Sequence, residues 1–211
     1  MSRAALGTIL FAMLFAVPSL AQPVSPPADD PEVKLRAAYE RFAQGCDTRS
    51  IEKGYAKAVE QLRSNDPDTQ QVGLQTLAAS QSPDALLLIV PLLDSPNVHT
   101  PINAGLAIER IVEAVCLKRR DRAHLDRVSI LPPGPNDVDL RPLAWVVQHM
   151  LKTEEPNLQS YAASMIGYLK LTEFADDLHA LLNSRHPAVS NAAKSAIEMM
   201  GASASKTQIS N

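Results

Sequence analysis

One pattern of apolar positions recurs along the chain, and each copy begins at a proline. In the clearest copy, Pro187 is followed by an aliphatic residue after two positions (Val189), a small residue after six (Ala193) and another aliphatic residue after ten. Residues at these spacings lie on one face of an α-helix, and proline suits the first helical turn, where its missing N–H is not needed. The same pattern begins at Pro31, Pro67, Pro96 and Pro156. After Pro96 the helix itself is expected to start at Thr100-Pro101 and to run to about Cys116. The sequence therefore predicts a helix after each of these five prolines.

Partner helices are predicted before the later prolines. Apolar residues at helical spacing occupy residues 51–63, 83–93, 141–151 and 173–182, and Pro91 predicts a kink in the second of these segments. Hairpin dipeptides are absent and alternating β-branched runs are few, so strands are not predicted. Aromatic residues make up only 4% of the chain, which leaves packing to alanine and leucine and favours helix–helix contact. We therefore expect an all-α fold.

The spacing of the prolines indicates a repeat. It is about 30 residues, except for about 60 between Pro96 and Pro156. A unit of helix, proline turn and helix cannot bury its apolar faces alone, so such units stack on one another. We interpret the long interval as two units, one of them replaced by a loop insertion at residues 117–139. The repeat domain is then expected over residues 30–201, with a disordered tail at 202–211.

Two stretches carry a resemblance to a known family. They are Asp30-Pro31-Glu32-Val33 with Ala37-Ala38, and His186-Pro187-Ala188-Val189 with Ala192-Ala193. These residues resemble short HEAT-like repeats of the phycobilisome-lyase-like type. The resemblance implies a right-handed α-solenoid of stacked antiparallel helix pairs, whose second helices line a concave face. Such families often have a basic residue three positions after the proline, and here only Lys34 conforms, which argues against a function that needs a basic ladder.

The resemblance also implies where a partner would bind. Positions four and eight after the prolines share one face of the second helices. Their residues are Gln71, Gln75, Thr100, Ala104, Ser160, Ser164, Asn191 and Ser195. This strip is small, uncharged and flat, which suits a protein or peptide and not a phosphate group. An ordinary solvated face is the alternative.

A basic cluster lies within the predicted loop insertion. Arg119, Arg120 and Arg122 follow Lys118. They would either dock an acidic partner or anionic head group, or remain part of a solvated loop.

The two cysteines, Cys46 and Cys116, are candidates for a disulfide. Such a bond would close a loop of about 70 residues and contribute roughly 4 kcal/mol. Helices in neighbouring units lie about 10 Å apart, however, whereas a disulfide needs Cα atoms closer than about 7 Å. Both states of the pair stay open from the sequence.

The N-terminus has the pattern of a cleavable signal peptide. Arg3 precedes an apolar run from Leu6 to Val17, and Ser19-Leu20-Ala21 places small residues at a cleavage site. We predict cleavage after Ala21, a flexible lead-in at residues 22–29, and a periplasmic or secreted protein, with an uncleaved membrane anchor as the alternative. The net charge of −3 is mild and gives no pull toward nucleic acid.

Catalytic and metal-binding motifs are not found. The five histidines lack zinc-like spacing, and no nucleophile motif or phosphate-binding loop occurs, so no cofactor or metal is expected. Glu109, Lys194 and Glu198 are the few acid and base residues expected on the inner face.

We expect a non-catalytic exported scaffold that binds a protein or peptide partner. The alternatives are an accessory factor or lyase acting on a cofactor-bearing protein, or a small-ligand-binding protein.

Overall fold

A computed structural model describes residues 29–126 and 138–207, with side chains described for residues 29–118 and 138–201. The described chain is all-α, as predicted, and contains no strand. Its α-helices are α1 (Pro31–Gly45), α2 (Thr48–Gly54), α3 (Ala56–Leu62), α4 (Pro67–Ser80), α5 (Leu86–Ile89), α6 (His99–Asp126), α7 (Ala144–Leu151), α8 (Pro156–Leu169), α9 (Ala175–Leu181) and α10 (Pro187–Thr207). Short 3₁₀ helices are η1 (Pro83–Ala85), η2 (Val90–Asp94), η3 (Arg141–Leu143) and η4 (Thr172–Phe174).

An acidic residue followed by proline begins three of the long helices. The side chain of Asp30 accepts a hydrogen bond from the N–H of Glu32 at the start of α1, and Asp66 accepts one from the N–H of Thr69 at the start of α4. Glu155 does the same at the start of α8. A carboxylate satisfies N–H groups that lack a partner in the first turn and interacts favourably with the helix dipole. The proline turns therefore fix where these helices begin.

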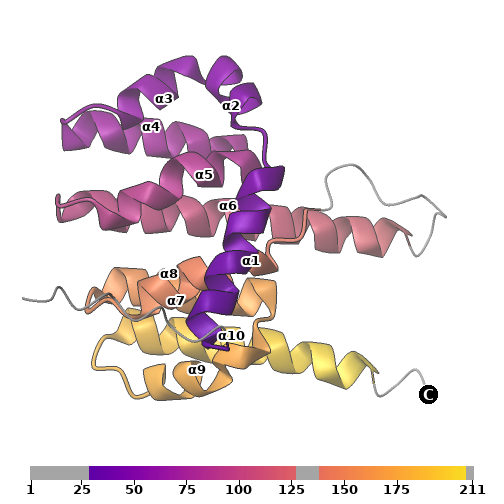
Figure 1. Cartoon of the computed structure of the whole chain (residues 1–211). Helices are drawn as coiled ribbons and strands as arrows, with labels where there is room; N and C mark the ends of the chain where they lie inside the picture. Colours follow the sequence, from indigo (N-terminus) through magenta and orange to yellow (C-terminus); the bar gives the residue numbers. More distant parts are fainter. Residues whose placement is uncertain (1–28, 127–137, 208–211) are drawn as a thin grey trace, which may run out of the picture.

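The helices form pairs, and the second members of the pairs pack on one another. α3 packs on α4, η2 on α6, α7 on α8 and α9 on α10. Consecutive second helices also touch, since α4 packs on α6, α6 on α8, and α8 on α10. Figure 1 shows these four second helices lying one below another. The arrangement buries one continuous core, whose fully buried residues include Leu77, Ile108, Ile111, Met165 and Ile166.

The first proline-initiated helix does not join this stack, which corrects the expectation that five equivalent helices line one face. α1 packs on α7 and η3, far along the chain, and Figure 1 shows it crossing the other helices. None of its residues is fully buried. Tyr39 stacks on Trp145, with ring centroids 5.1 Å apart. The pattern at Pro31 predicted the helix correctly but not its place, because an amphipathic stripe does not specify which apolar surface it covers.

The long interval between Pro96 and Pro156 has a different cause from the one predicted. α6 does not end near Cys116 but continues to Asp126, so residues 117–126 of the expected loop insertion are helical. Lysine, arginine, alanine and leucine dominate this stretch, and glycine and proline are absent from it, which favours continuation of the helix. Residues 127–137 lie outside the described part of the chain. The described residues thus form one pair where two units were expected.

Three smaller boundaries also differ from prediction. The segment at 51–63 divides at Tyr55 into α2 and α3. The segment at 83–93 is helical but turns to 3₁₀ geometry at Val90, next to Pro91, because proline cannot donate an α-helical hydrogen bond. α10 continues beyond Gly201 to Thr207, into the expected disordered tail.

The predicted signal peptide and most of the lead-in lie outside the described residues, and no described helix is long and apolar enough to cross a membrane.

Candidate partner-binding surface

Most of the predicted strip lies on the surface of consecutive helices. Gln75 on α4 and both Asn191 and Ser195 on α10 are exposed, while Gln71, Ser160 and Ser164 are partly exposed. Ser160 also makes a long hydrogen bond to the carbonyl of Ala188, which joins α8 to the start of α10. The structure therefore brings these residues onto helices that touch in order.

Thr100 and Ala104 are the exceptions, because both are buried and their prediction as surface residues is wrong. Thr100 is 2% exposed, and its hydroxyl donates a hydrogen bond of 2.8 Å to Oε1 of Gln70 on α4. The buried residues Ala104, Ala107 and Ile108 of α6 correspond to Ala162, Met165 and Ile166 of α8, which aligns Thr100 with the core residue Leu158. Counting from Pro96 is thus two residues out of register, because α6 begins at His99.

With the register corrected, the strip is apolar where it crosses α6. The positions equivalent to Ser160 and Ser164 are Ile102 and Leu106, and both are partly exposed. Val72 on α4 is 48% exposed. Large apolar side chains that remain in contact with water on one surface are typical of a protein contact.

Beside the strip, two carboxyl groups and two phenols gather between α6 and α8. Tyr168 donates a hydrogen bond of 2.8 Å from its hydroxyl to Oε1 of Glu113. Burial and then the negative charge of Glu113 together raise the pKa of Glu109 to about 7, while the charge of Arg110 opposes the shift. Burial, together with the hydrogen bond to Glu113, raises the pKa of Tyr168. The carboxyl group of Glu109 in this cluster is therefore expected to gain or lose its proton near neutral pH.

The sequence named only part of this cluster. Glu109 was expected on the inner face, whereas Glu113, Tyr161 and Tyr168 were not among the expected site residues. Burial raises the pKa of Tyr161, and the charge of Glu109 adds to that shift, so the phenol and the carboxyl are electrostatic neighbours. The spacing of four residues between the carboxyls and of seven between the tyrosines places each pair on one helix face, a signal that was present in the sequence.

A groove of about 500 Å³ runs between α4 and α6 next to this cluster. Alanines form its apolar part, and polar side chains surround them. Its lining residues are Gln75, Ala78, Ala79, Gln81, Arg110, Glu113, Ala114, Leu117 and Lys118. Among the residues with described side chains, no group of three or more histidine, cysteine, aspartate or glutamate residues is arranged to hold a metal ion.

The basic cluster belongs to the C-terminal end of α6. Arg119, Arg120 and Arg122 lie in this helix, and their side chains are outside the described part of the structure. Figure 1 shows this end of α6 projecting beyond the neighbouring helices.

No disulfide joins Cys46 to Cys116 in the structure. The thiol of Cys46 lies at the end of α1 beside Asp84, and burial, followed by the charge of Asp84 and a hydrogen bond to it, raises the pKa of this thiol to about 11. Cys116 lies on α6, close enough to Tyr168 to influence its pKa. The two thiols therefore have different neighbours, and of the two states that the sequence left open, the structure shows the one without a disulfide.

No protein-family model matches the chain, and no curated protein matches it. Among solved structures, it is similar to a crystal structure of an engineered protein from a structural-genomics consortium. The two are 18% identical with a TM-score of 0.48, over 85% of this chain and 76% of the other. Neither an activity nor a partner follows from this likeness.

Proposed function

We propose that the chain is an exported, non-catalytic helical-repeat protein of the HEAT-like kind, which binds a protein or peptide partner on the exposed face of α4, α6, α8 and α10. The arrangement would be a right-handed α-solenoid. The ordered contacts from α4 to α10 support the stack. Each pair contributes one helix to a common face, which suits an extended partner.

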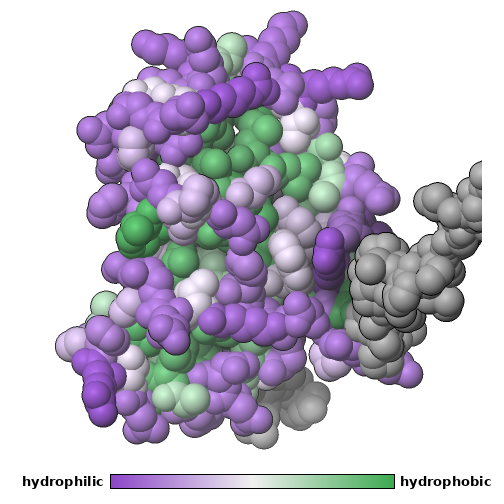
Figure 2. All heavy atoms as spheres, turned by 60° about the vertical axis from the view of Figure 1, so that its left-hand side comes forward, coloured by the Kyte–Doolittle hydropathy of each residue, from purple (hydrophilic) through white to green (hydrophobic). Residues whose placement is uncertain are grey.

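One observation carries the proposal most directly. The face combines uncharged polar residues with apolar ones that remain partly exposed, among them Val72, Ile102 and Leu106. Figure 2 shows one side of the molecule, on which hydrophilic side chains surround apolar areas. A protein interface has the same composition, with apolar and amide groups toward its middle and charge toward its rim.

The test is affinity capture from the native envelope, with the captured partner identified by mass spectrometry. We expect Ser164→Arg with Ser195→Arg to remove that partner, because bulky charges would interrupt the small, uncharged strip on α8 and α10. Thr172→Arg with Asn183→Arg is the matched control, since both residues are exposed away from this face. Retention of the partner by the first variant would contradict the proposal.

N-terminal sequencing of the exported chain, expected to begin at Gln22, tests the signal peptide separately.

A second candidate is an accessory factor or lyase that acts on a cofactor-bearing protein. The observation in its favour is Glu109, because a carboxyl with a pKa of about 7 suits general acid or base catalysis. Glu109→Gln would then abolish turnover of the captured partner while leaving capture intact. If turnover is absent from the wild type or unchanged in the variant, the scaffold role stands alone.

A further inference from the structure

We infer that the groove between α4 and α6 binds an acidic peptide segment of the partner, an inference that rests on the proposed function and specifies the chemistry of one part of its surface. Two cationic side chains, Arg110 and Lys118, lie at the groove, and both are exposed. The one carboxylate in the lining is that of Glu113, which already accepts a hydrogen bond from Tyr168.

The shape of the groove suits a peptide main chain. Ala78, Ala79 and Ala114 present only methyl groups, so a backbone can approach the helices closely. Gln75 and Gln81 carry amides that both donate and accept hydrogen bonds, as an extended main chain requires. Extended segments gain affinity from such main-chain hydrogen bonds and specificity from their side chains.

The spacing of the two cations indicates the spacing of the acidic residues. Arg110 and Lys118 are separated by eight positions of one helix, which corresponds to about 12 Å along its axis. An extended peptide covers that distance in about four residues. We therefore expect two carboxylates three or four residues apart, one near each cation.

The charge around the groove is consistent with this occupant. Glu109, on the far side of Arg110, has its pKa raised to about 7, so near neutral pH its carboxyl is partly protonated and repels an acidic ligand less. Beyond Lys118, α6 continues through Arg119, Arg120 and Arg122 in sequence. The chain as a whole has a net charge of −3, so acidic peptides are not attracted to it in general.

The experiment measures binding of fluorescein-labelled decapeptides to the intact protein by anisotropy. The probe carries two glutamates three residues apart in a glycine, serine and alanine background, and the comparison peptide carries glutamines at those positions. We expect the glutamate peptide to bind at least tenfold more tightly, and Arg110→Gln with Lys118→Gln to remove that preference. Because exposed charges are screened, the preference should also fall between 20 and 200 mM salt, values chosen as roughly low and physiological.

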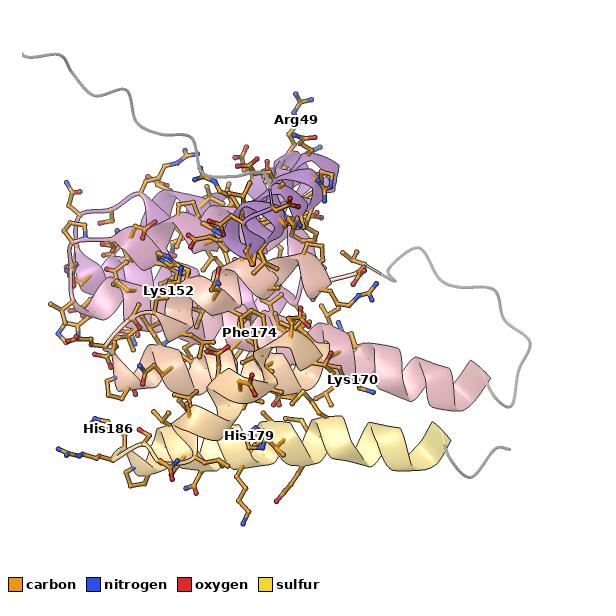
Figure 3. All side chains as sticks on the ribbon, turned by 60° about the horizontal axis from the view of Figure 1, so that its bottom comes forward. Arg49, Lys152, Lys170, Phe174, His179 and His186 are labelled. Carbon is orange, nitrogen blue, oxygen red and sulfur yellow. The ribbon has the colours of Figure 1, made fainter. Side chains whose placement is uncertain are left out.

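The matched control removes two cations with the same sequence spacing elsewhere. Arg49 on α2 and Lys57 on α3 are both exposed, and Figure 3 shows Arg49 projecting away from the helices. Arg49→Gln with Lys57→Gln should leave the glutamate preference unchanged. A separate variant, Ala114→Leu, narrows the groove without changing charge and should weaken binding of the glutamate peptide.

The outcomes separate this inference from the proposed function. Equal binding of the two peptides, or binding that survives loss of Arg110 and Lys118, overturns the acidic-peptide site even if the partner is still captured. If the peptide binds as expected but Ser164→Arg with Ser195→Arg still captures the partner, the groove stands and the wider partner-binding face fails.

Discussion

At the scale of single residues, Glu109 is a carboxyl group whose pKa the fold raises well above its ordinary value. Its side chain lies on α6 beside Glu113, in a site where burial disfavours the ionised form. An ordinary glutamate in the unfolded chain has a pKa of 4.5, whereas that of Glu109 is about 7 in the fold. Between these values the native state binds more protons than the unfolded state, so the stability contributed by this group is lost as pH rises.

Glu109→Gln should therefore stabilise the protein in a pH-dependent way. At pH 4 the carboxyl is protonated in both states, so we expect little difference in the free energy of unfolding. At pH 8 we expect the variant to be more stable by about 1 kcal/mol, a value reduced from the full pKa difference because solvent screens a partly exposed group. Urea unfolding across this range measures it, with Glu60→Gln, exposed on α3, as the control. A uniform effect at all pH values would refute the explanation.

The packing of α8 against α10 requires a glycine at position 167. A Cβ at this position would lie 2.8 Å from the Cα of Ala196 on α10, closer than packed side chains allow. We expect Gly167→Ala to lower the free energy of unfolding by about 1–3 kcal/mol, because α8 and α10 must move apart. Gly54→Ala meets no atom within 4 Å and should be neutral or slightly stabilising. Equal stability of the two variants in urea would contradict the close packing.

Thr100 shows why part of the surface could not be predicted from the sequence. The proline pattern predicted five helices along the sequence but not their places in the fold, since the cap and the apolar stripe are local features. The register of α6 depends instead on its contacts with α4 and α8, which bury Ala104 and Ile108 and leave Leu106 partly exposed. Pro96 lies three residues before the first residue of α6, so the distance from proline to core is not constant.

At the scale of elements, α1 differs in burial from the long helices of the stack, such as α4 and α8. It contributes no fully buried residue and is held by the stacking of Tyr39 on Trp145 and by an ion pair between Glu32 and Lys152. The ion pair is exposed on both sides, so it contributes little, whereas an aromatic pair is worth about 0.5–1.5 kcal/mol beyond its burial. The aromatic contact and the packing of the partly buried Leu35 and Phe42 against the core therefore contribute more to the docking of α1 than the ion pair does. No local pattern could have revealed the aromatic contact, because Tyr39 and Trp145 are distant in sequence.

The docking of α1 can be measured with the chain's single tryptophan, Trp145. Tyr39→Ala removes the ring that covers it, so we expect acrylamide to quench its fluorescence more strongly while the remaining helices keep their circular dichroism. Arg36→Ala changes an exposed residue of the same helix and should leave quenching unchanged. Unaltered quenching in Tyr39→Ala would show that the ring of Tyr39 does not shield Trp145 from solvent.

At the scale of the whole molecule, the four helix pairs share one core, but the individual helices differ in how many residues they bury in it. The core runs without interruption from Ile51 on α2 to Ala196 on α10. α8 lies in its middle and packs on α6, α7 and α10, whereas α2 buries only Ile51. We therefore expect the paired helices to unfold together, with α1 and α2 opening at lower free energy than the rest.

Hydrogen exchange of backbone amides tests this order directly. We expect the amides of α8 and of the first half of α6 to exchange slowest, at rates set by global unfolding, because their neighbours cover them on several sides. The amides of α1 and α2 should exchange fastest among the α-helices with described side chains. Tyr39→Ala should accelerate α1 further and leave α8 unchanged, since Tyr39 acts only on the docking of α1. If α1 is as well protected as α8, its contact with α7 and η3 is an integral part of the cooperative core and not a separable cover.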